Sequence, residues 1–236
     1  MALCNKLCSA EQYHWSVVKC FDEQRPGETK KMSYSLDAIA PLREFVVEMT
    51  TLVNQESEEK NLITKGSVLL KSLIQSDTWL PEFCTVPHPE FYQQFLLHAD
   101  PLGRFSVVSF VWGPGQKTPI HDHCVWGLIG MLRGMEKGQR YKQLSSGELV
   151  LDGPEAVLRQ GDIEVVSPTV GDIHLVSNAV PDKTSISVHV YGANIGAVKR
   201  HTYDPVTGSP KNFVSGYSSK QIPNLWDRSA EVRASL

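Results

Sequence analysis

Two hydrophobic periodicities divide the chain. From residue 35 to about residue 97, apolar side chains recur three and four positions apart, as in Leu42, Phe45, Val46 and Met49. That spacing places them on one face of an α-helix. From Arg104 onward, apolar residues come in short runs rich in β-branched and aromatic side chains, and glycines separate these runs. The pattern predicts a helical part followed by a β-structure.

Three helices are expected in the first part. Ser35 is the predicted cap of a helix that runs through Met49, and a second helix is expected over residues 58–74. A third, after Pro87 and Pro89, would carry the apolar residues Phe91, Phe95 and Leu96. These helices would pack together on whatever β-structure follows.

The second part reads as many short strands at close intervals, which is typical of a sandwich or small barrel. Strands are expected over residues 105–112, 125–132, 163–166, 174–177 and 185–191. We therefore expect one mainly β globular domain with an N-terminal helical segment. Its predicted parts are an irregular N-terminal extension (1–34), a helical segment packed on the barrel (35–100), the barrel (101–200) and a C-terminal wrapping tail (201–236).

Composition narrows the class of protein. The chain has 236 residues, of which 41% are hydrophobic and 21% charged, so it can bury a substantial core. A formal charge of −3, with no basic stripe, argues against nucleic-acid binding. No apolar run reaches the length of a membrane span or of a secretory signal. Five cysteines without zinc-finger spacing indicate free thiols and a cytoplasmic location, whereas the oligomeric state is not readable.

Three histidines are the candidate metal ligands. His121 and His123 stand two residues apart, so on a strand they project to the same side, and His174 is the natural third ligand from a distant strand. Three neutral imidazoles would leave coordination positions open, as in catalytic metal sites. A lone histidine is more often a surface or satisfied core residue, which is our interpretation of His14, His88, His98 and His201.

The strand over residues 185–191 alternates apolar and polar side chains. Ser187, His189 and Tyr191 occupy its polar face. That face could point to solvent, as in an ordinary half-buried strand. Alternatively it lines the metal cavity, where a hydroxyl, an imidazole and a phenol would form a hydrogen-bond chain that orients Tyr191.

These residues resemble the motifs of the cupin superfamily, which implies a small, jelly-roll-like cupin β-barrel. The match is carried by Gly115, His121, His123 and Gly134 in the first motif and by Gly171, His174 and Asn178 in the second. Two spacings in the second motif, from Gly161 to Pro168 and from Pro168 to Gly171, are one residue longer than usual. Gly127 stands where most cupins place a glutamate ligand. The resemblance therefore implies a three-histidine site without a carboxylate.

With the S-x-H-x-Y strand included, the chain resembles more closely the thiol dioxygenases, the family of cysteine dioxygenase and 3-mercaptopropionate dioxygenase. The resemblance covers residues 90–205. It implies one Fe(II) per chain held by His121, His123 and His174, O2 as co-substrate, and conversion of a small thiol into its sulfinic acid. It also implies that Tyr191, oriented by His189 and Ser187, acts beside the metal.

Two departures separate the chain from the animal cysteine dioxygenases. Those enzymes carry a cysteine cross-linked to the active-site tyrosine where this chain has Gly127, and Cys124 is out of register, so no thioether to Tyr191 is expected. They also bind the substrate carboxylate with an arginine where this chain has glutamines, of which Gln94 is the preferred counterpart to Gln93. Arg200 matches the arginine of 3-mercaptopropionate dioxygenases; without the resemblance it would read as a surface salt-bridge residue.

Two other functions stay open. One is a different metal-dependent cupin enzyme, such as a zinc or manganese isomerase, although many of those add a glutamate ligand that Gly127 does not provide. The other is a non-catalytic ligand-binding cupin, a class that often loses ligating histidines. Among small thiols, the sequence favours 3-mercaptopropionate but leaves L-cysteine and cysteamine open.

Overall fold

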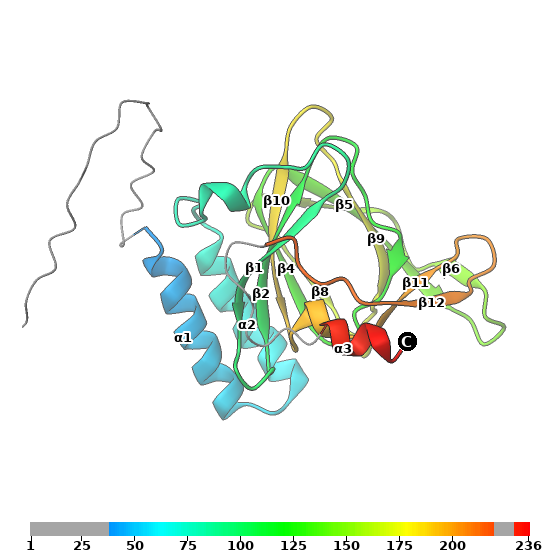
Figure 1. The fold of residues 1–236 in the computed structure, drawn as a ribbon, viewed down its shortest axis with the longest axis horizontal. Helices are drawn as coiled ribbons and strands as arrows, with labels where there is room; N and C mark the ends of the chain where they lie inside the picture. The colour runs from blue at the N-terminus through cyan, green and yellow to red at the C-terminus, as the bar shows by residue number, and fades with distance from the viewer. Residues whose placement is uncertain (1–37, 220–228) are drawn as a thin grey trace, which may run out of the picture. The chain divides into compact units, whose positions relative to one another are not determined.

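A computed structural model describes residues 38–219 and 229–236 of the chain (Figure 1). The expected N-terminal extension and the predicted cap at Ser35 lie outside the described residues. Within them, the expected fold class is confirmed: the chain is mainly β, its sheets curve around a common interior, and helices precede them.

Two of the three expected helices are present. The first, α1 (Ala40–Gln55), has Ile39 at its N-cap and Pro41 in its first turn, where a missing backbone N–H costs nothing. The second, α2 (Glu59–Leu73), agrees closely with its predicted range. Each helix buries residues three and four positions apart, as the periodicity predicts.

The third predicted helix is wrong. Residues after Pro89 form strand β1 (Gln93–Ala99), which pairs antiparallel with strand β2 (Ser106–Trp112). The apolar group of Phe91, Phe95 and Leu96 is too short to distinguish a helix from a strand by its spacing. Pairing with β2 provides hydrogen-bond partners for the backbone of this segment, and tertiary context decides the outcome.

The described strands form a five-stranded sheet in the order β1-β2-β10-β4-β8 and a seven-stranded sheet in which β12-β11-β3-β9-β5-β6 follow one another and β7 pairs with β5. All pairs are antiparallel. The remaining strands are β3 (Ile120–His121), β4 (Gly127–Arg133), β5 (Met135–Gln143), β6 (Leu149–Leu151), β7 (Ala156–Arg159), β8 (Ile163–Val166), β9 (Ile173–Asn178), β10 (Ser185–Tyr191), β11 (Arg200–Tyr203) and β12 (Pro210–Phe213).

Both faces of the five-stranded sheet are buried. Helices α1 and α2 cover its outer face, and the seven-stranded sheet lies opposite its inner face (Figure 1). Strand β10 shows the result, because all of its residues are buried. Ile186, Val188 and Val190 join the core under the helices, whereas Tyr191 belongs to the core inside the barrel. The polar face of this strand therefore lines the interior and does not face solvent.

The segment after residue 200, which we expect to wrap the surface, contributes strands to the larger sheet. β11 pairs with both β3 and β12, so it lies directly beside the strand of His121. A short helix, α3 (Ser229–Ala234), and two single 3-10 turns, η1 (Glu82–Cys84) and η2 (Ile195–Ala197), complete the described elements. The pairing of β11 places its first residue, Arg200, at the wall of the barrel.

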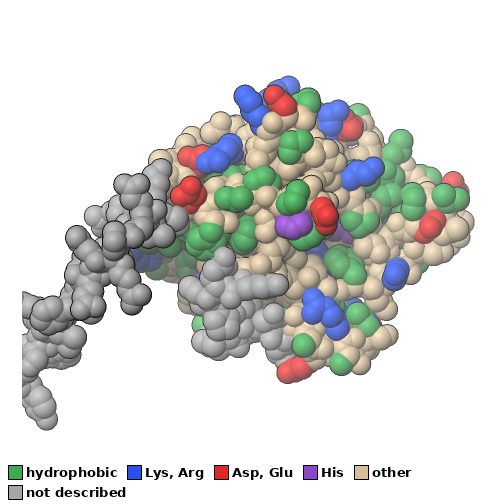
Figure 2. All heavy atoms as spheres, turned by 45° about the horizontal axis from the view of Figure 1, so that its top comes forward, with side chains coloured by type: hydrophobic (Ala, Val, Ile, Leu, Met, Phe, Trp, Pro, Cys, Tyr) green, Lys and Arg blue, Asp and Glu red, His purple; other side chains and the backbone are tan. Residues whose placement is uncertain are grey.

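The surface carries no dominant charge on the face displayed in Figure 2, where basic and acidic side chains are interspersed among hydrophobic ones. Among residues 38–219 and 229–236, no helix has both the length and the apolar character that crossing a bilayer requires.

Candidate metal centre and active site

Three histidines meet inside the barrel. His121 is the last residue of β3, His123 follows two residues later, and His174 lies on β9 in register with His121. One ring nitrogen of each lies within 4.8 Å of those of the other two, and the ring centroids are 4.8–4.9 Å apart. We call these three residues the histidine wall. They are the group that the spacing of the sequence predicts.

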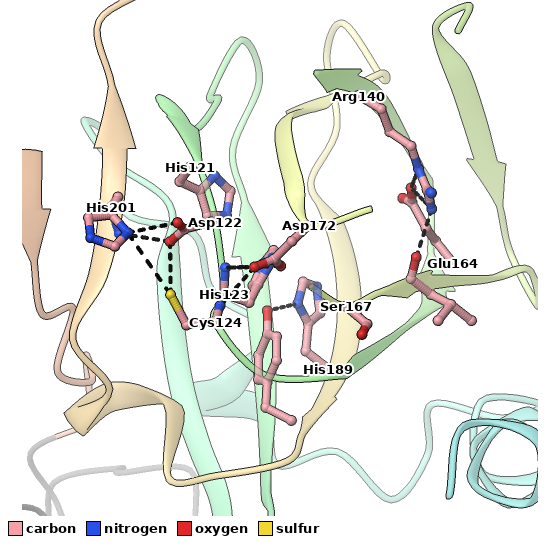
Figure 3. Close-up of polar contacts among 12 residues, drawn as sticks. His121, Asp122, His123, Cys124, Arg140, Glu164, Ser167, Asp172, His189 and His201 are labelled. Carbon is pink, nitrogen blue, oxygen red and sulfur yellow. Dashed lines mark hydrogen bonds and ion pairs between the residues drawn. The ribbon is translucent and has the colours of Figure 1, made fainter. Parts of the chain in front are cut away.

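Hydrogen bonds fix two of the three rings. Nδ1 of His121 lies 3.1 Å from the carbonyl oxygen of Pro119, and Nδ1 of His123 lies 2.8 Å from a carboxylate oxygen of Asp172 (Figure 3). A proton on each Nδ1 leaves Nε2 as the free donor for a metal. Among the described residues, none is within hydrogen-bond distance of the buried Nδ1 of His174.

The histidine wall is electrically neutral. Burial lowers the pKa of His121 to about 4 and holds the pKa of His123 and of His174 well below the ordinary value. Mutual repulsion and the positive charge of Arg200 add to this effect at His123. Neutral imidazole is the form that binds metals, and three such donors leave further coordination positions open. The residues present therefore fit a metal ion of the catalytic kind.

A second group, which we call the relay wall, consists of Ser187, His189 and Tyr191 on β10. The hydroxyl oxygen of Ser187 lies 2.8 Å from Nε2 of His189, and Nδ1 of His189 lies 2.7 Å from the phenol oxygen of Tyr191. Burial lowers the pKa of His189 to about 3 and raises that of Tyr191. The ring of Tyr191 stacks on His123 with centroids 5.4 Å apart, so the relay ends beside the histidine wall.

Gly127 packs directly against the tyrosine ring. It is the register partner of Tyr191 in the β4–β10 pair, and a Cβ atom built on it would lie 2.7 Å from a ring carbon of that side chain. Cys124 points elsewhere, because its sulfur lies 3.5 Å from Asp122 and 4.0 Å from Nδ1 of His201 (Figure 3). The tyrosine ring thus occupies the space that a side chain at position 127 would need.

Arg200 is buried in the same cavity. Its side chain is 4% exposed, lies 4.6 Å over the ring of Phe213 and donates to the hydroxyl of Ser215 at 2.7 Å. Its Nε has no hydrogen-bond partner among the described residues. Burial lowers the pKa of this guanidinium, although an arginine stays charged at neutral pH. A buried cation with a free donor is a ready partner for an anion.

Gln94 also lines the cavity, whereas its neighbour Gln93 does not. The amide nitrogen of Gln94 donates to the carbonyl of Gly216 at 2.6 Å, which anchors the side chain to the C-terminal segment. The cavity has a volume of about 140 Å³. Its lining residues are Tyr92, Gln94, Phe110, Trp112, Thr118, Pro119, His121, His123, His174, Val176, His189, Tyr191, Arg200, Thr202 and Phe213. That size suits a small molecule.

A larger depression of about 580 Å³ lies between α2 and strands β7 and β8, lined by residues such as Ser67, Lys71 and Leu158. It is shallow and holds no histidine. The smaller, enclosed cavity brings together a buried cation, three neutral imidazoles and a phenol. We therefore place the functional site in the smaller cavity.

Two aspartates near the histidine wall were not identified from the sequence. Asp172 holds His123, and Asp122 accepts from Nδ1 of His201 at 2.8 Å and from the hydroxyl of Tyr203 at 2.8 Å (Figure 3). Asp122 thereby ties the metal-side loop to β11, the strand of Arg200. The signal for Asp172 is its place two residues before His174, which puts both on one side of an extended chain.

The chain has clear relatives. Residues 35–204 match the family described as "Cysteine dioxygenase type I". Cysteine dioxygenase type 1 of Homo sapiens is 28% identical over 138 residues, which covers 55% of this chain and 66% of the human protein. The Bos taurus protein is 26% identical over 124 residues, covering 50% of this chain and 58% of its own. These matches span less than two thirds of either relative.

Solved structures give weaker likenesses. A double-stranded β-helix protein from Klebsiella pneumoniae aligns with a TM-score of 0.39 and 20% identity, over 49% of this chain and 89% of its own. An oxalate oxidase in complex with glycolate gives a TM-score of 0.37 and 23% identity, over 46% and 55%. The family match alone covers most of the chain, including both walls of the cavity. The chain belongs to the cysteine dioxygenase type I family.

Proposed function

We propose that the chain is a non-haem Fe(II) thiol dioxygenase that converts a small carboxylate thiol and O2 into the corresponding sulfinic acid. The substrate class is 3-mercaptopropionate, L-cysteine or both, and the reaction conserves atoms, since R–SH and O2 together make R–SO2H. The observation that carries the proposal is Arg200, a buried guanidinium with a free donor in the same small cavity as three neutral histidines.

One ferrous ion per chain fits His121, His123 and His174 as its protein ligands. Imidazole donors suit iron, and a site without a carboxylate keeps the full positive charge of the ion. Iron, when bound there, supplies the redox chemistry that allows O2 to react with a thiolate. Zinc and copper also accept imidazole ligands, so the choice of iron rests on the family membership.

Electrostatics of the cavity favour an anionic substrate. Arg200 contributes a buried positive charge, and the neutral histidines do not offset it. The thiolate is the nucleophilic, metal-binding form of a thiol, so a positive environment promotes the loss of its proton. We assign the substrate carboxylate to Arg200, whose planar guanidinium can form paired charge-assisted bonds.

Gln94 is the weaker of the two proposed substrate contacts. One N–H of its amide donates to the carbonyl of Gly216, so the second N–H and the carbonyl oxygen are left to face a ligand. The remaining N–H is a neutral donor, which binds a carboxylate less strongly than a guanidinium does. We propose that Gln94 shapes the substrate end of the cavity while Arg200 provides the charge.

Tyr191 is the proposed proton donor beside the sulfur atom of the thiol substrate and the oxygen atoms of O2. Burial raises its pKa, so the phenol keeps its proton at neutral pH. His189 and Ser187 orient it through the hydrogen bonds of the relay wall. Phe110, Trp112 and Val176 add apolar side chains to the lining, which helps to exclude water from a reactive site. We place the reaction in the cytoplasm, where thiols such as those of Cys84 and Cys124 remain reduced.

Substitution of Arg200 tests the substrate assignment. Arg200→Ala should lower kcat/KM for 3-mercaptopropionate by roughly 10–200-fold, since a charge-assisted bond contributes about 1.5–3 kcal/mol. Arg200→Lys should restore only part of this, because a point charge cannot reproduce paired bonds. Cysteamine, which has no carboxylate, should be little affected. Steady-state O2 consumption by the iron-loaded protein measures all three.

Lys199→Ala is the matched control, because Lys199 is an exposed cation next to Arg200 in the chain. It should leave the kinetics with both thiols unchanged. Equal losses with 3-mercaptopropionate and cysteamine in Arg200→Ala would show that Arg200 supports the fold and does not bind the carboxylate.

A further inference from the structure

Glu136 is a buried acid inside the barrel that the mechanism above does not use. It lies on β5, opposite Asn178 of β9 and Leu158 of β7. Its side chain is 1% exposed, and neither carboxyl oxygen has a hydrogen-bond partner that meets normal geometry. An ionised carboxylate in that position would be costly, so the surroundings favour the protonated acid.

The nearest polar neighbours of Glu136 belong to the relay wall and to the strand beside it. Burial raises the pKa of Glu136 to about 8, whereas the nearby polar groups of Ser187 and Trp112 lower it and the charge of Glu164 raises it. The indole nitrogen of Trp112 also lies 3.4 Å from the hydroxyl of Ser187. Glu136 therefore faces Ser187, at the end of the relay farthest from Tyr191.

The state of Glu136 decides which way the hydrogen bonds of the relay run. A protonated Glu136 donates a hydrogen bond to the hydroxyl oxygen of Ser187, and the hydroxyl of Ser187 then donates a hydrogen bond to Nε2 of His189. The imidazole must then carry its proton on Nδ1 and donate it to the oxygen of Tyr191. The phenol hydrogen is left free to point into the cavity.

An ionised Glu136 reverses every bond. Ser187 then donates to the carboxylate and accepts from Nε2–H of His189, and Nδ1 accepts the phenol hydrogen of Tyr191. The proton that should face the substrate is turned away from it. Both arrangements satisfy the same distances of 2.8 and 2.7 Å, because those distances do not depend on the direction of donation.

We propose that Glu136 is a positioning residue at the buried end of a four-membered relay, Glu136–Ser187–His189–Tyr191, and that its proton keeps the hydroxyl of Tyr191 directed into the cavity. The relay is a property of the described fold, and only its effect on catalysis rests on the proposed function. Other charged groups near Glu136 are accounted for: Glu164 of β8 is neutralised by Arg140 of β5 at 3.0 Å.

The first test reads the imidazole of His189 directly. Nitrogen-15 NMR distinguishes Nδ1–H from Nε2–H, and the protein loaded with Zn²⁺ avoids the broadening that iron causes. In the wild type, the His189 signal, assigned by its loss in His189→Gln, should change from Nδ1–H to Nε2–H as the pH rises through about 8. Glu136→Gln should keep a single tautomer of His189 at every pH, because its amide has the shape of the acid but cannot ionise.

The second test is the pH profile of the iron-loaded enzyme with 3-mercaptopropionate. From pH 7 to pH 9, kcat/KM of the wild type should fall about tenfold as Glu136 ionises. This fall should be absent in Glu136→Gln and in Ser187→Ala, which cuts the relay without touching the acid. Glu148→Gln, the same change at an exposed glutamate, should keep the wild-type profile.

The outcomes are distinguishable. One tautomer of His189 at every pH in the wild type would overturn the relay, whatever the activity. A Glu136→Gln profile that matches Glu148→Gln would overturn its role in catalysis. The double variant Glu136→Gln/Ser187→Ala should have the same pH dependence of kcat/KM as Ser187→Ala alone. A difference between them would contradict the proposal that Glu136 acts through Ser187. Absence of turnover with every thiol would refute the proposed function, and the NMR result would still decide the relay.

Discussion

The histidine wall and the relay wall line the same cavity, but they are built in different ways. The three histidines come from two segments far apart in the chain, and each ring is oriented independently, by its own hydrogen-bond partner or by none. The relay wall comes from a single strand, and the direction of each hydrogen bond in it depends on the neighbouring one. Damage to the histidine wall should therefore abolish a ligand set, whereas damage to the relay wall should change the direction or strength of hydrogen bonds.

The largest effect is expected from the histidine wall. Alanine at His121, His123 or His174 should reduce iron affinity by at least about 100-fold, because even residues that only orient ligands contribute 10–100-fold. Metal analysis after gel filtration measures the loss. His88→Ala, which changes a half-buried histidine stacked on Phe91 outside the cavity, should keep normal iron content. Near-normal iron in His174→Ala would show that the third ligand is misassigned.

The next largest effect is expected from Glu136, the buried acid behind the relay wall, in the pH dependence of stability. Glu136 has a pKa of about 8 when folded and an ordinary value of 4.5. Between these values the folded state holds a proton that the unfolded state lacks, so the free energy of unfolding should decrease as the pH rises, by up to about 1.4 kcal/mol per unit. The loss of stability that Glu136 causes is absent below pH 4.5 and reaches its full, constant value above about pH 8.

Urea denaturation of the wild type and Glu136→Gln at pH 5 and pH 7.5 measures this term. The variant should lose less stability than the wild type over that interval, and Glu148→Gln should follow the wild type. Parallel losses in all three proteins would mean that Glu136 ionises normally in the folded chain.

A smaller effect is expected where the two walls meet. Gly127→Ala adds a methyl group 2.7 Å from the ring of Tyr191, which must shift away. Overpacking of this kind typically costs about 1–3 kcal/mol of stability. Iron content should fall far less than in the histidine variants. Gly138→Ala is the control, because its methyl group would meet only the flexible end of Glu164 at 3.3 Å. Equal stability of the two variants would contradict the close packing described.

No effect at all is expected on covalent mass. Gly127 offers no sulfur to Tyr191, and Cys124 is engaged with Asp122. Intact mass spectrometry should give the mass of the unmodified sequence in this region. A mass lower by the hydrogens that a thioether removes, mapped to a peptide containing Cys124 and Tyr191, would overturn the register of Gly127 and Tyr191.

The two walls also differ in how far the sequence predicts them. The relay wall follows from alternation alone, since Ser187, His189 and Tyr191 stand two apart on one strand. Whether that face met solvent or the cavity depended on what covers the sheet, and the helices on its outer face decide it. The grouping of the histidines was predicted by H-x-H and a distant His174.

Glu136 and the position of Arg200 could not be derived from local pattern. The segment MEKGQRYKQ reads as a polar strand, and nothing in it indicates that Glu136 turns inward. Its approach to Ser187 depends on the packing of two sheets against each other. Arg200 lies at the cavity because β11 pairs with β3, and this pairing joins residues about 80 positions apart. Arg200 was predicted as a substrate-binding residue from the family resemblance, and the spacing of residues in the sequence did not indicate it. The third predicted helix failed for the same reason, because pairing with β2 determines β1.

The central claim is that the cavity adds both atoms of O2 to the sulfur of a small carboxylate thiol. Its most direct test supplies iron-loaded protein with 3-mercaptopropionate and O2 labelled with oxygen-18, and analyses the product by mass spectrometry. We predict a sulfinic acid that carries both labelled atoms, with His174→Ala giving none. A disulfide as the main product, a sulfinate with oxygen from water, or no consumption of O2 with any of the three thiols would contradict this account.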